Sequence, residues 1–120
     1  MQRSRSWIFT INNPTQEPTL ESSGAAYITY GREVGANGTP HLQGFVQFTN
    51  AKTRNAVRTK LAGAHLEIRR GTITQAIEYC HKDGDTYEEG IRPLDPVEKG
   101  NAEKVRWEHA REMAKTGIYY

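Results

Sequence analysis

Apolar and polar residues alternate along several short stretches of this chain, which is the pattern of half-buried β-strands. The clearest stretch is 6–12, where aromatic and β-branched residues precede the turn-forming sequence Asn13-Pro14-Thr15. Four more stretches predict further strands, the last of them a weaker edge strand: 26–30, 41–48, 65–69 and 85–91.

Other segments repeat apolar residues at the three- and four-residue spacing of helices. Thr72 or Thr74 can cap the start of a helix that runs to about Lys82. Segment 16–24 has one weak apolar position and is expected to form a loop or, at most, a short helix. The predicted helices are 52–61, 72–82 and 102–115.

This order of elements predicts an α+β sandwich in which a central antiparallel sheet of about five strands carries helices on one face. The other face is then expected to be free for function. A chain of 120 residues is sized for one compact domain. No apolar run approaches the length of a membrane span, so no membrane association is expected.

Charge is distributed unevenly along the chain. Segment 50–70 has six basic residues and one acidic residue, whereas 87–120 has six basic and seven acidic residues. The basic segment fits contact with a polyanion, although solvated charges on a helix face would give the same pattern. The single cysteine, Cys80, excludes an internal disulfide and a cysteine-rich zinc site.

His41 and Gln43 project from the same face of the strand 41–48, because side chains in a strand alternate with period two. A turn rich in glycine, asparagine and proline separates them from Glu33 and could fold it back alongside. A carboxylate, an imidazole and an amide oxygen together suit a hard divalent ion. Taken alone, however, such residues usually face solvent for solubility.

Two further pairs of residues are also candidates for a metal site or for catalysis. His65 and Glu67 alternate on a strand and could also offer metal ligands, or serve a structural or DNA-contacting role. Tyr79 and Lys82 stand three residues apart and share one face of their predicted helix. A tyrosine in this position either packs on the sheet or acts as a nucleophile.

Three motifs occur in a fixed order: Phe9-Thr10-Ile11-Asn12-Asn13-Pro14, Thr39-Pro40-His41-Leu42-Gln43-Gly44-Phe45 and Tyr79-Cys80-His81-Lys82-Asp83-Gly84. Together they resemble the motifs of the Rep initiators of circular single-stranded DNA viruses, most closely the circovirus type. These initiators are HUH endonucleases, with an RRM-like, ferredoxin-like sandwich fold. The second motif of that family commonly carries two histidines, and Gln43 stands in place of the second here.

The resemblance implies metal-dependent, sequence-specific nicking and joining of single-stranded DNA at a viral origin stem-loop. Tyr79 would be the nucleophile and would form a 5′-phosphotyrosine. Glu33, His41 and Gln43 would hold Mn²⁺ or Mg²⁺. Lys82 would act on the tyrosine, the metal shell or the DNA.

Candidate DNA contacts complete this picture. Asn12 and Asn13 either contact DNA or fix the turn, and strand aromatics such as Phe9 can serve as core or as base-stacking platforms. The full candidate set is Phe9, Thr10, Asn12, Asn13, Arg54, Arg58, Lys60 and Arg69.

The resemblance also sets expectations for the whole protein. Residues 1–95 would form the nuclease domain, and 96–120 would begin a linker toward an oligomerisation and helicase region. The full-length protein would be a homo-oligomer that acts in the host nucleus, and this fragment a monomer. A different function remains open: a non-catalytic, RRM-like module that binds single-stranded nucleic acid without cutting it.

Overall fold

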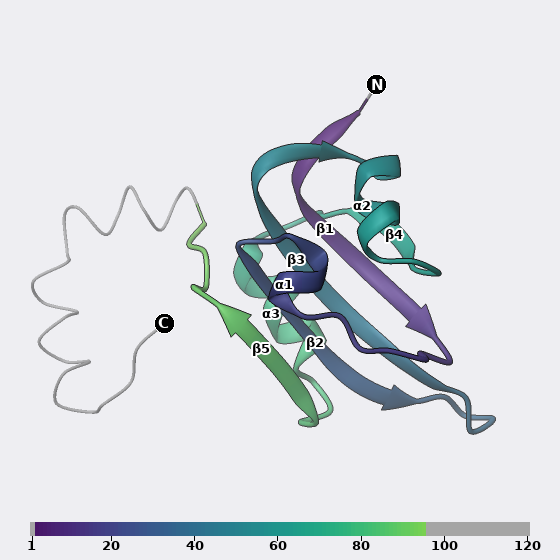
Figure 1. Cartoon of the computed structure of the whole chain (residues 1–120). Coiled ribbons are helices and arrows are strands. Elements are labelled where there is room, and N and C mark those ends of the chain that lie inside the picture. The colour runs from purple at the N-terminus through teal and green to yellow at the C-terminus, as the bar shows by residue number, and fades with distance from the viewer. Residues whose placement is uncertain (1, 96–120) are drawn as a thin grey trace, which may run out of the picture.

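A computed structural model describes residues 2–95 of the chain, which form five strands and three short helices (Figure 1). The elements in chain order are β1 (Arg3–Asn12), α1 (Leu20–Ser23), β2 (Tyr27–Val34), β3 (Pro40–Thr53), α2 (Arg54–Lys60), β4 (His65–Ile68), α3 (Ile73–Cys80) and β5 (Thr86–Gly90). The predicted helix 102–115 and the predicted linker 96–120 lie outside the described residues.

The strands form one sheet in the order β4-β1-β3-β2-β5, and every neighbouring pair is antiparallel. The long strands β1 and β3 lie at its centre, where Phe9 faces Gly44 across the pair. The predicted α+β class and the five-stranded antiparallel sheet are therefore confirmed. Strand β3 continues to Thr53, so the predicted helix 52–61 begins two residues later than expected.

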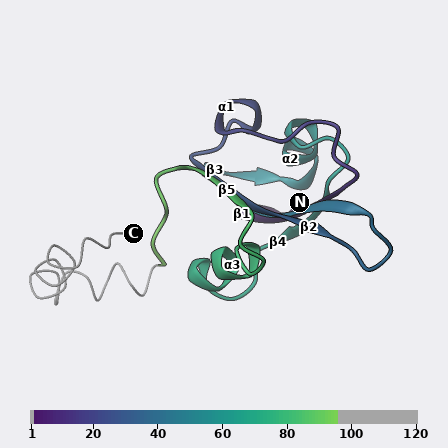
Figure 2. The ribbon, with the colours of Figure 1, turned by 90° about the horizontal axis from the view of Figure 1, so that it is seen from below.

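Helices cover both faces of the sheet, which corrects the prediction that they pack on one face. Figure 2 shows α1 and α2 on one side and α3 on the other. Successive residues of β1 explain this arrangement: Phe9 belongs to the core beneath α1 and α2, while its neighbour Ile8 packs into the core beneath α3. Both sets of strand residues are partly apolar, so each face requires a cover.

Phe9 illustrates how tightly the α1/α2 face is packed. Its side chain is fully buried, and a Cβ atom added to Gly44 would lie 2.1 Å from its ring. The glycine opposite therefore makes room for the ring, which packs edge-on against Tyr30. A side chain enclosed in this way serves packing and is not available to stack on a base.

Candidate active site

A hairpin brings a carboxylate and an imidazole together on the α3 face. Glu33 on β2 pairs directly with His41 on β3, and the turn between them is closed by a hydrogen bond from the Gly35 amide to the Thr39 carbonyl. The His41 Nε2 and Glu33 Oε1 atoms lie 3.0 Å apart. Both side chains are largely shielded, with exposed fractions of 21% and 11%. The structure thus places Glu33 beside His41.

Gln43 extends this group along the same face of β3. It pairs with Thr10 on β1, and the Thr10 hydroxyl donates a 3.0 Å hydrogen bond to Gln43 Oε1. This bond holds the amide group in one orientation. A carbonyl oxygen has two lone pairs, so Oε1 keeps one for a second partner.

Helix α3 crosses this face because one side of it is apolar. Its residues Ile73, Ala76, Ile77 and Cys80 are buried against Tyr27 and Phe45 of the sheet. The end of the helix approaches β2 so closely that a Cβ atom at Gly31 would lie 2.1 Å from the Cys80 carbonyl oxygen. Glycine at this position is therefore needed for α3 to reach the Glu33 strand.

Tyr79 lies in the last turn of α3, and Lys82 follows two residues after the helix ends. The Tyr79 side chain is 52% exposed, and the Lys82 ammonium lies 4.3 Å from the centre of its ring, a cation–π contact. The same ammonium lies 3.9 Å from Glu33 Oε2. Lys82 thus connects the predicted nucleophile with the predicted metal ligands.

The donor set fits a hard divalent cation. Glu33 Oε2 is buried and accepts no hydrogen bond, so it has free lone pairs aimed into the site. Among residues 2–95, no three His, Cys, Asp or Glu side chains cluster as a metal site. Glu33, His41 and the Gln43 amide are the donors on this face that could hold such an ion, with further positions open to water or a ligand.

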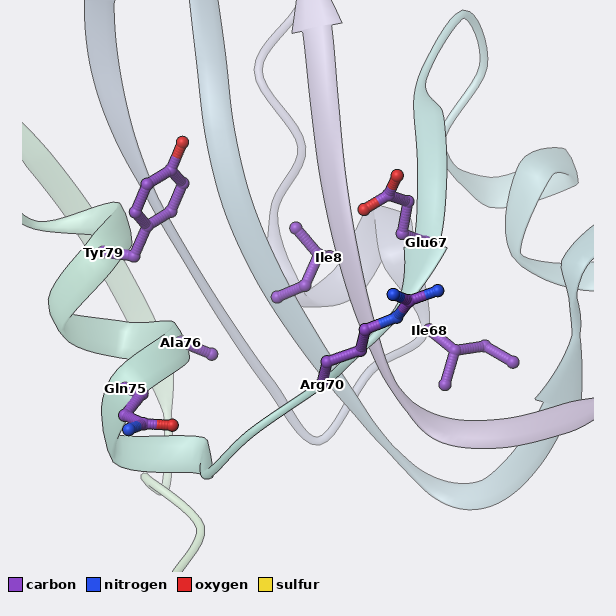
Figure 3. A pocket seen from close by; sticks show the side chains of 7 residues that line it. All are labelled: Ile8, Glu67, Ile68, Arg70, Gln75, Ala76 and Tyr79. Carbon is purple, nitrogen blue, oxygen red and sulfur yellow. The ribbon is translucent and has the colours of Figure 1, made fainter.

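A shallow hollow lies beside Tyr79, between α3 and the β4 edge of the sheet (Figure 3). Tyr79 and Ala76 line it from the helix, and Ile8 lies across from them on β1. Polar groups from Glu67, Arg70 and Gln75 surround this apolar surface. The hollow can therefore receive a small flat group next to the Tyr79 hydroxyl.

Comparison with known proteins identifies the family of this chain. Residues 4–83 match the family described as "Putative viral replication protein". The chain belongs to this viral replication protein family. It is 41% identical over 86 residues to a replication-associated protein of Beak and feather disease virus, covering 68% of this chain and 30% of that protein.

Two further relatives come from different virus groups. A master replication protein of Banana bunchy top virus is 42% identical over 84 residues, covering 70% of this chain and 29% of the relative. A replication-associated protein of Porcine circovirus 2 is 40% identical over 93 residues, covering 70% and 29%. The chain therefore spans about 30% of the length of the curated relatives that it matches.

The predicted DNA contacts do not form one surface. Thr10 and Asn12 lie beside the site, paired with Gln43 and His41. Asn13 adopts a left-handed backbone conformation (φ 51°), and its amide donates to the Pro40 carbonyl, so its backbone fixes the turn.

The predicted basic contacts lie elsewhere. Arg54, Arg58 and Lys60 belong to α2, on the opposite face from Tyr79 (Figure 2). The Arg54 guanidinium lies over the Trp7 ring and donates to the Leu66 carbonyl, so it has a structural role. The structure therefore does not bring the α2 cations to the site.

Arg69 is the last of the predicted DNA contacts, and His65 and Glu67 on β4 are the alternative pair of metal ligands. Arg69 donates to the Gly71 carbonyl, and its Nε atom is buried, so its guanidinium is directed at the protein rather than at solvent. His65 and Glu67 are highly exposed, and His65 Nε2 lies 3.5 Å from Glu67 Oε1. In the sheet, Thr10 on β1 stands between His65 on β4 and Gln43 on β3. The pair on β4 is therefore separate from Glu33, His41 and Gln43.

His81 has a role that the sequence did not indicate. Its Nε2 lies 2.7 Å from the Thr29 hydroxyl in a half-buried position. Because that hydroxyl donates to the Tyr87 carbonyl, its oxygen accepts the hydrogen of Nε2. Burial lowers the pKa of His81, which favours the neutral imidazole. His81 therefore anchors the end of α3 to β2.

Cys80 is buried in the core beneath α3. Burial, helped by the nearby Glu33 carboxylate, raises the pKa of its thiol to about 12. The thiol is thus protonated and unreactive at neutral pH. None of the described helices is long and apolar enough to cross a membrane.

Proposed function

We propose that this chain is the nuclease part of a viral replication initiator, which nicks and rejoins single-stranded DNA through Tyr79. The observation that carries the proposal is the position of Lys82, which contacts both the Tyr79 ring and Glu33. The family membership and the printed names of the relatives, replication-associated and master replication proteins, support a role in replication.

The proposed chemistry is an exchange of phosphoester bonds. The Tyr79 oxygen attacks the scissile phosphorus, so a bond forms from tyrosine to the 5′ phosphate and the bond to the 3′ oxygen breaks. The phenol proton passes to solvent, to which Tyr79 is open, and the departing oxygen is protonated as a 3′-hydroxyl. A phenol is a weak nucleophile at neutral pH, so it requires assistance.

Lys82 would provide part of this assistance. An ammonium beside the ring stabilises the phenolate and the negative charge that develops on the phosphate oxygens. Glu33, His41 and Gln43 would hold Mn²⁺ or Mg²⁺, which when bound supplies Lewis-acid stabilisation to a phosphate oxygen. Thr10 would keep the Gln43 amide oriented for this task.

The same site would also catalyse the reverse reaction, in which the cut strand is rejoined. The tyrosyl phosphoester retains the energy of the cleaved bond, so a 3′-hydroxyl can attack it and release Tyr79. The hollow beside Tyr79 offers space for a base or sugar next to the scissile phosphate. In the whole protein, we propose that this nuclease part acts in the host nucleus, together with a helicase and in an oligomer.

A cleavage assay tests the proposal. A pool of single-stranded oligonucleotides with a randomised central segment and different labels at the 5′ and 3′ ends is incubated with the chain and Mn²⁺ or Mg²⁺, with and without EDTA; the 5′ label follows the released strand and the 3′ label follows the adduct. Products are resolved on a denaturing gel. We expect cleaved strands and a protein–DNA adduct with metal, and neither with EDTA.

The matched variants are Tyr79→Phe and Tyr87→Phe. Tyr79→Phe removes only the proposed nucleophile and should abolish the adduct while DNA binding persists. Tyr87 stacks on Tyr30 on the opposite face, so its variant should form the adduct normally. Metal-independent binding without cleavage would instead favour the non-catalytic, RRM-like module.

A further inference from the structure

The chain returns to the start of helix α3 after it leaves the sheet. Asp95, five residues beyond the end of β5, is 6% exposed. Its Oδ1 accepts the Ile73 amide at 2.5 Å, and its Oδ2 accepts the amide and hydroxyl of Thr74, both at 3.2 Å. The carboxylate therefore holds two amides of the first turn of α3 from a position more than 20 residues away in sequence.

These bonds complete a cap that the helix does not complete by itself. Thr72 and Gln75 form a capping box in which the Thr72 hydroxyl accepts the Gln75 amide. The amides of Ile73 and Thr74 remain outside this box, and the first turn contains no acidic residue. A carboxylate here satisfies both amides and complements the positive end of the helix dipole.

Asp95 is ionised in this setting. Burial alone would raise the pKa of its carboxyl, but the hydrogen bonds from Ile73 and Thr74 and the nearby Arg69 lower it below its usual value. The Nε atom of Arg69 is buried, and its positive charge lies close enough to Asp95 to contribute to this lowering of the pKa.

The other end of α3 is also held by distant groups. His81 contacts the Thr29 hydroxyl on β2, and the Cys80 carbonyl lies against Gly31. Tyr79 directly precedes these two residues in the chain, and its ring contacts Lys82 just beyond the helix. Because α3 has only eight residues, no more than about two helical turns separate its first turn from Tyr79.

We propose that Asp95 is a positioning residue that sets the placement of α3 on the sheet, and thereby the placement of Tyr79 and Lys82 relative to Glu33. The inference rests on the proposed function of Tyr79. It implies that the smallest fully active unit ends after Asp95 and not at Gly90, the end of β5.

The test compares Asp95→Ala and Asp95→Asn with Thr72→Ala in the full 120-residue chain. Thr72→Ala weakens the same helix end but leaves the Asp95 attachment in place. For each variant, thermal stability is measured first, and kcat and KM for a cleaved oligonucleotide are then measured well below the melting temperature.

We expect Asp95→Ala to lower kcat about 10- to 100-fold with KM nearly unchanged, because small displacements of a reacting group cost rates of this size. Asp95→Asn, which keeps one acceptor oxygen, should recover part of the loss. Thr72→Ala should stay within about twofold of the original kcat at a similar loss of stability. An equal fall of kcat in the Asp95→Ala and Thr72→Ala variants, or no fall in either, would overturn the inference.

A second readout does not depend on activity. Amide signals in ¹H–¹⁵N spectra of Asp95→Ala should shift at Tyr79 and Lys82 as well as at Ile73 and Thr74. Shifts confined to the first turn would contradict the inference. If the unmodified chain forms no adduct with DNA, the proposed function fails, and these spectra still decide whether Asp95 positions the helix.

Discussion

The two faces of the central strands differ in the kind of side chain that they carry. On the α1/α2 face, Phe9, Tyr30 and Leu42 are completely enclosed. On the α3 face, alternate residues of the same strands present polar groups, among them Thr10 and Gln43. Neighbouring positions on one strand therefore belong to two different environments.

This contrast follows from how α3 covers its face. The helix packs over Tyr27 and Phe45 and leaves the Glu33–His41 end of the strands free of apolar cover. The α1/α2 face has no comparable opening at Phe9. One face mainly contributes stability, and the other combines a smaller core with the proposed chemistry. Substitutions on the two faces should therefore change different measurements.

The largest expected effect is on the α3 face, at Glu33. Glu33→Gln keeps the size of the side chain but removes the charge that would hold the metal ion. We expect the rate of nicking to fall about 1,000-fold, the equivalent of about 4 kcal/mol. The measurement is the rate of adduct formation under single-turnover conditions, at increasing Mn²⁺ concentration.

Glu21→Gln is the matched control for this substitution. Glu21 is exposed on α1, which lies on the face of the sheet away from Tyr79 (Figure 2). Its variant should nick within about threefold of the original rate, because its carboxylate lies outside the proposed site. Equal losses in both variants would contradict the metal site at Glu33.

A change on the opposite face should affect stability instead. Phe9→Ala removes a fully buried ring and leaves a cavity beneath α1 and α2, so we expect a loss of about 3 kcal/mol in the free energy of unfolding. Chemical denaturation measures this loss, and the nicking rate of the remaining folded protein should be almost unchanged at low temperature.

Thr10 is the neighbour of Phe9 that faces the other way. Thr10→Ala removes one hydrogen bond to Gln43, so it should cost only about 1 kcal/mol of stability while raising the metal concentration needed for nicking about tenfold. If both variants changed stability and metal requirement in parallel, the proposed division between the faces would be wrong.

The smallest effect is expected for the cations of α2. Arg58 and Lys60 are exposed on the face away from Tyr79, and neither forms an ion pair within residues 2–95. The double variant Arg58→Glu, Lys60→Glu should therefore nick a short saturating oligonucleotide within about twofold of the original rate. A loss above tenfold would show that the cleaved strand reaches this face.

Much of the fold could be predicted because it depends on local patterns. Period-two alternation and turn residues located the strands, and the alternation correctly assigned His41 and Gln43 to one face of the sheet and Leu42 to the other. The pairing of Glu33 with His41 followed from the short turn between them. Each of these patterns involves residues that are close to one another in the sequence.

The remaining features depend on contacts between distant segments. Which face each helix covers was not predictable, since β-strand alternation does not say which side a crossover takes. The Asp95 and His81 attachments join residues separated by 21 or more positions, and neither has a local sequence signal. Phe9 lies within a recognised motif, and only its burial beside Gly44 shows that it serves packing.

Mapping the covalent adduct tests the central claim most directly. After reaction with a single-stranded oligonucleotide and Mn²⁺, nuclease and trypsin digestion would release the peptide 71–82, whose only tyrosine is Tyr79. The account predicts that mass spectrometry finds this peptide carrying a nucleotide through a phosphoester on Tyr79. A nucleotide attached to any other residue, or cleaved DNA with no adduct at all, would contradict it.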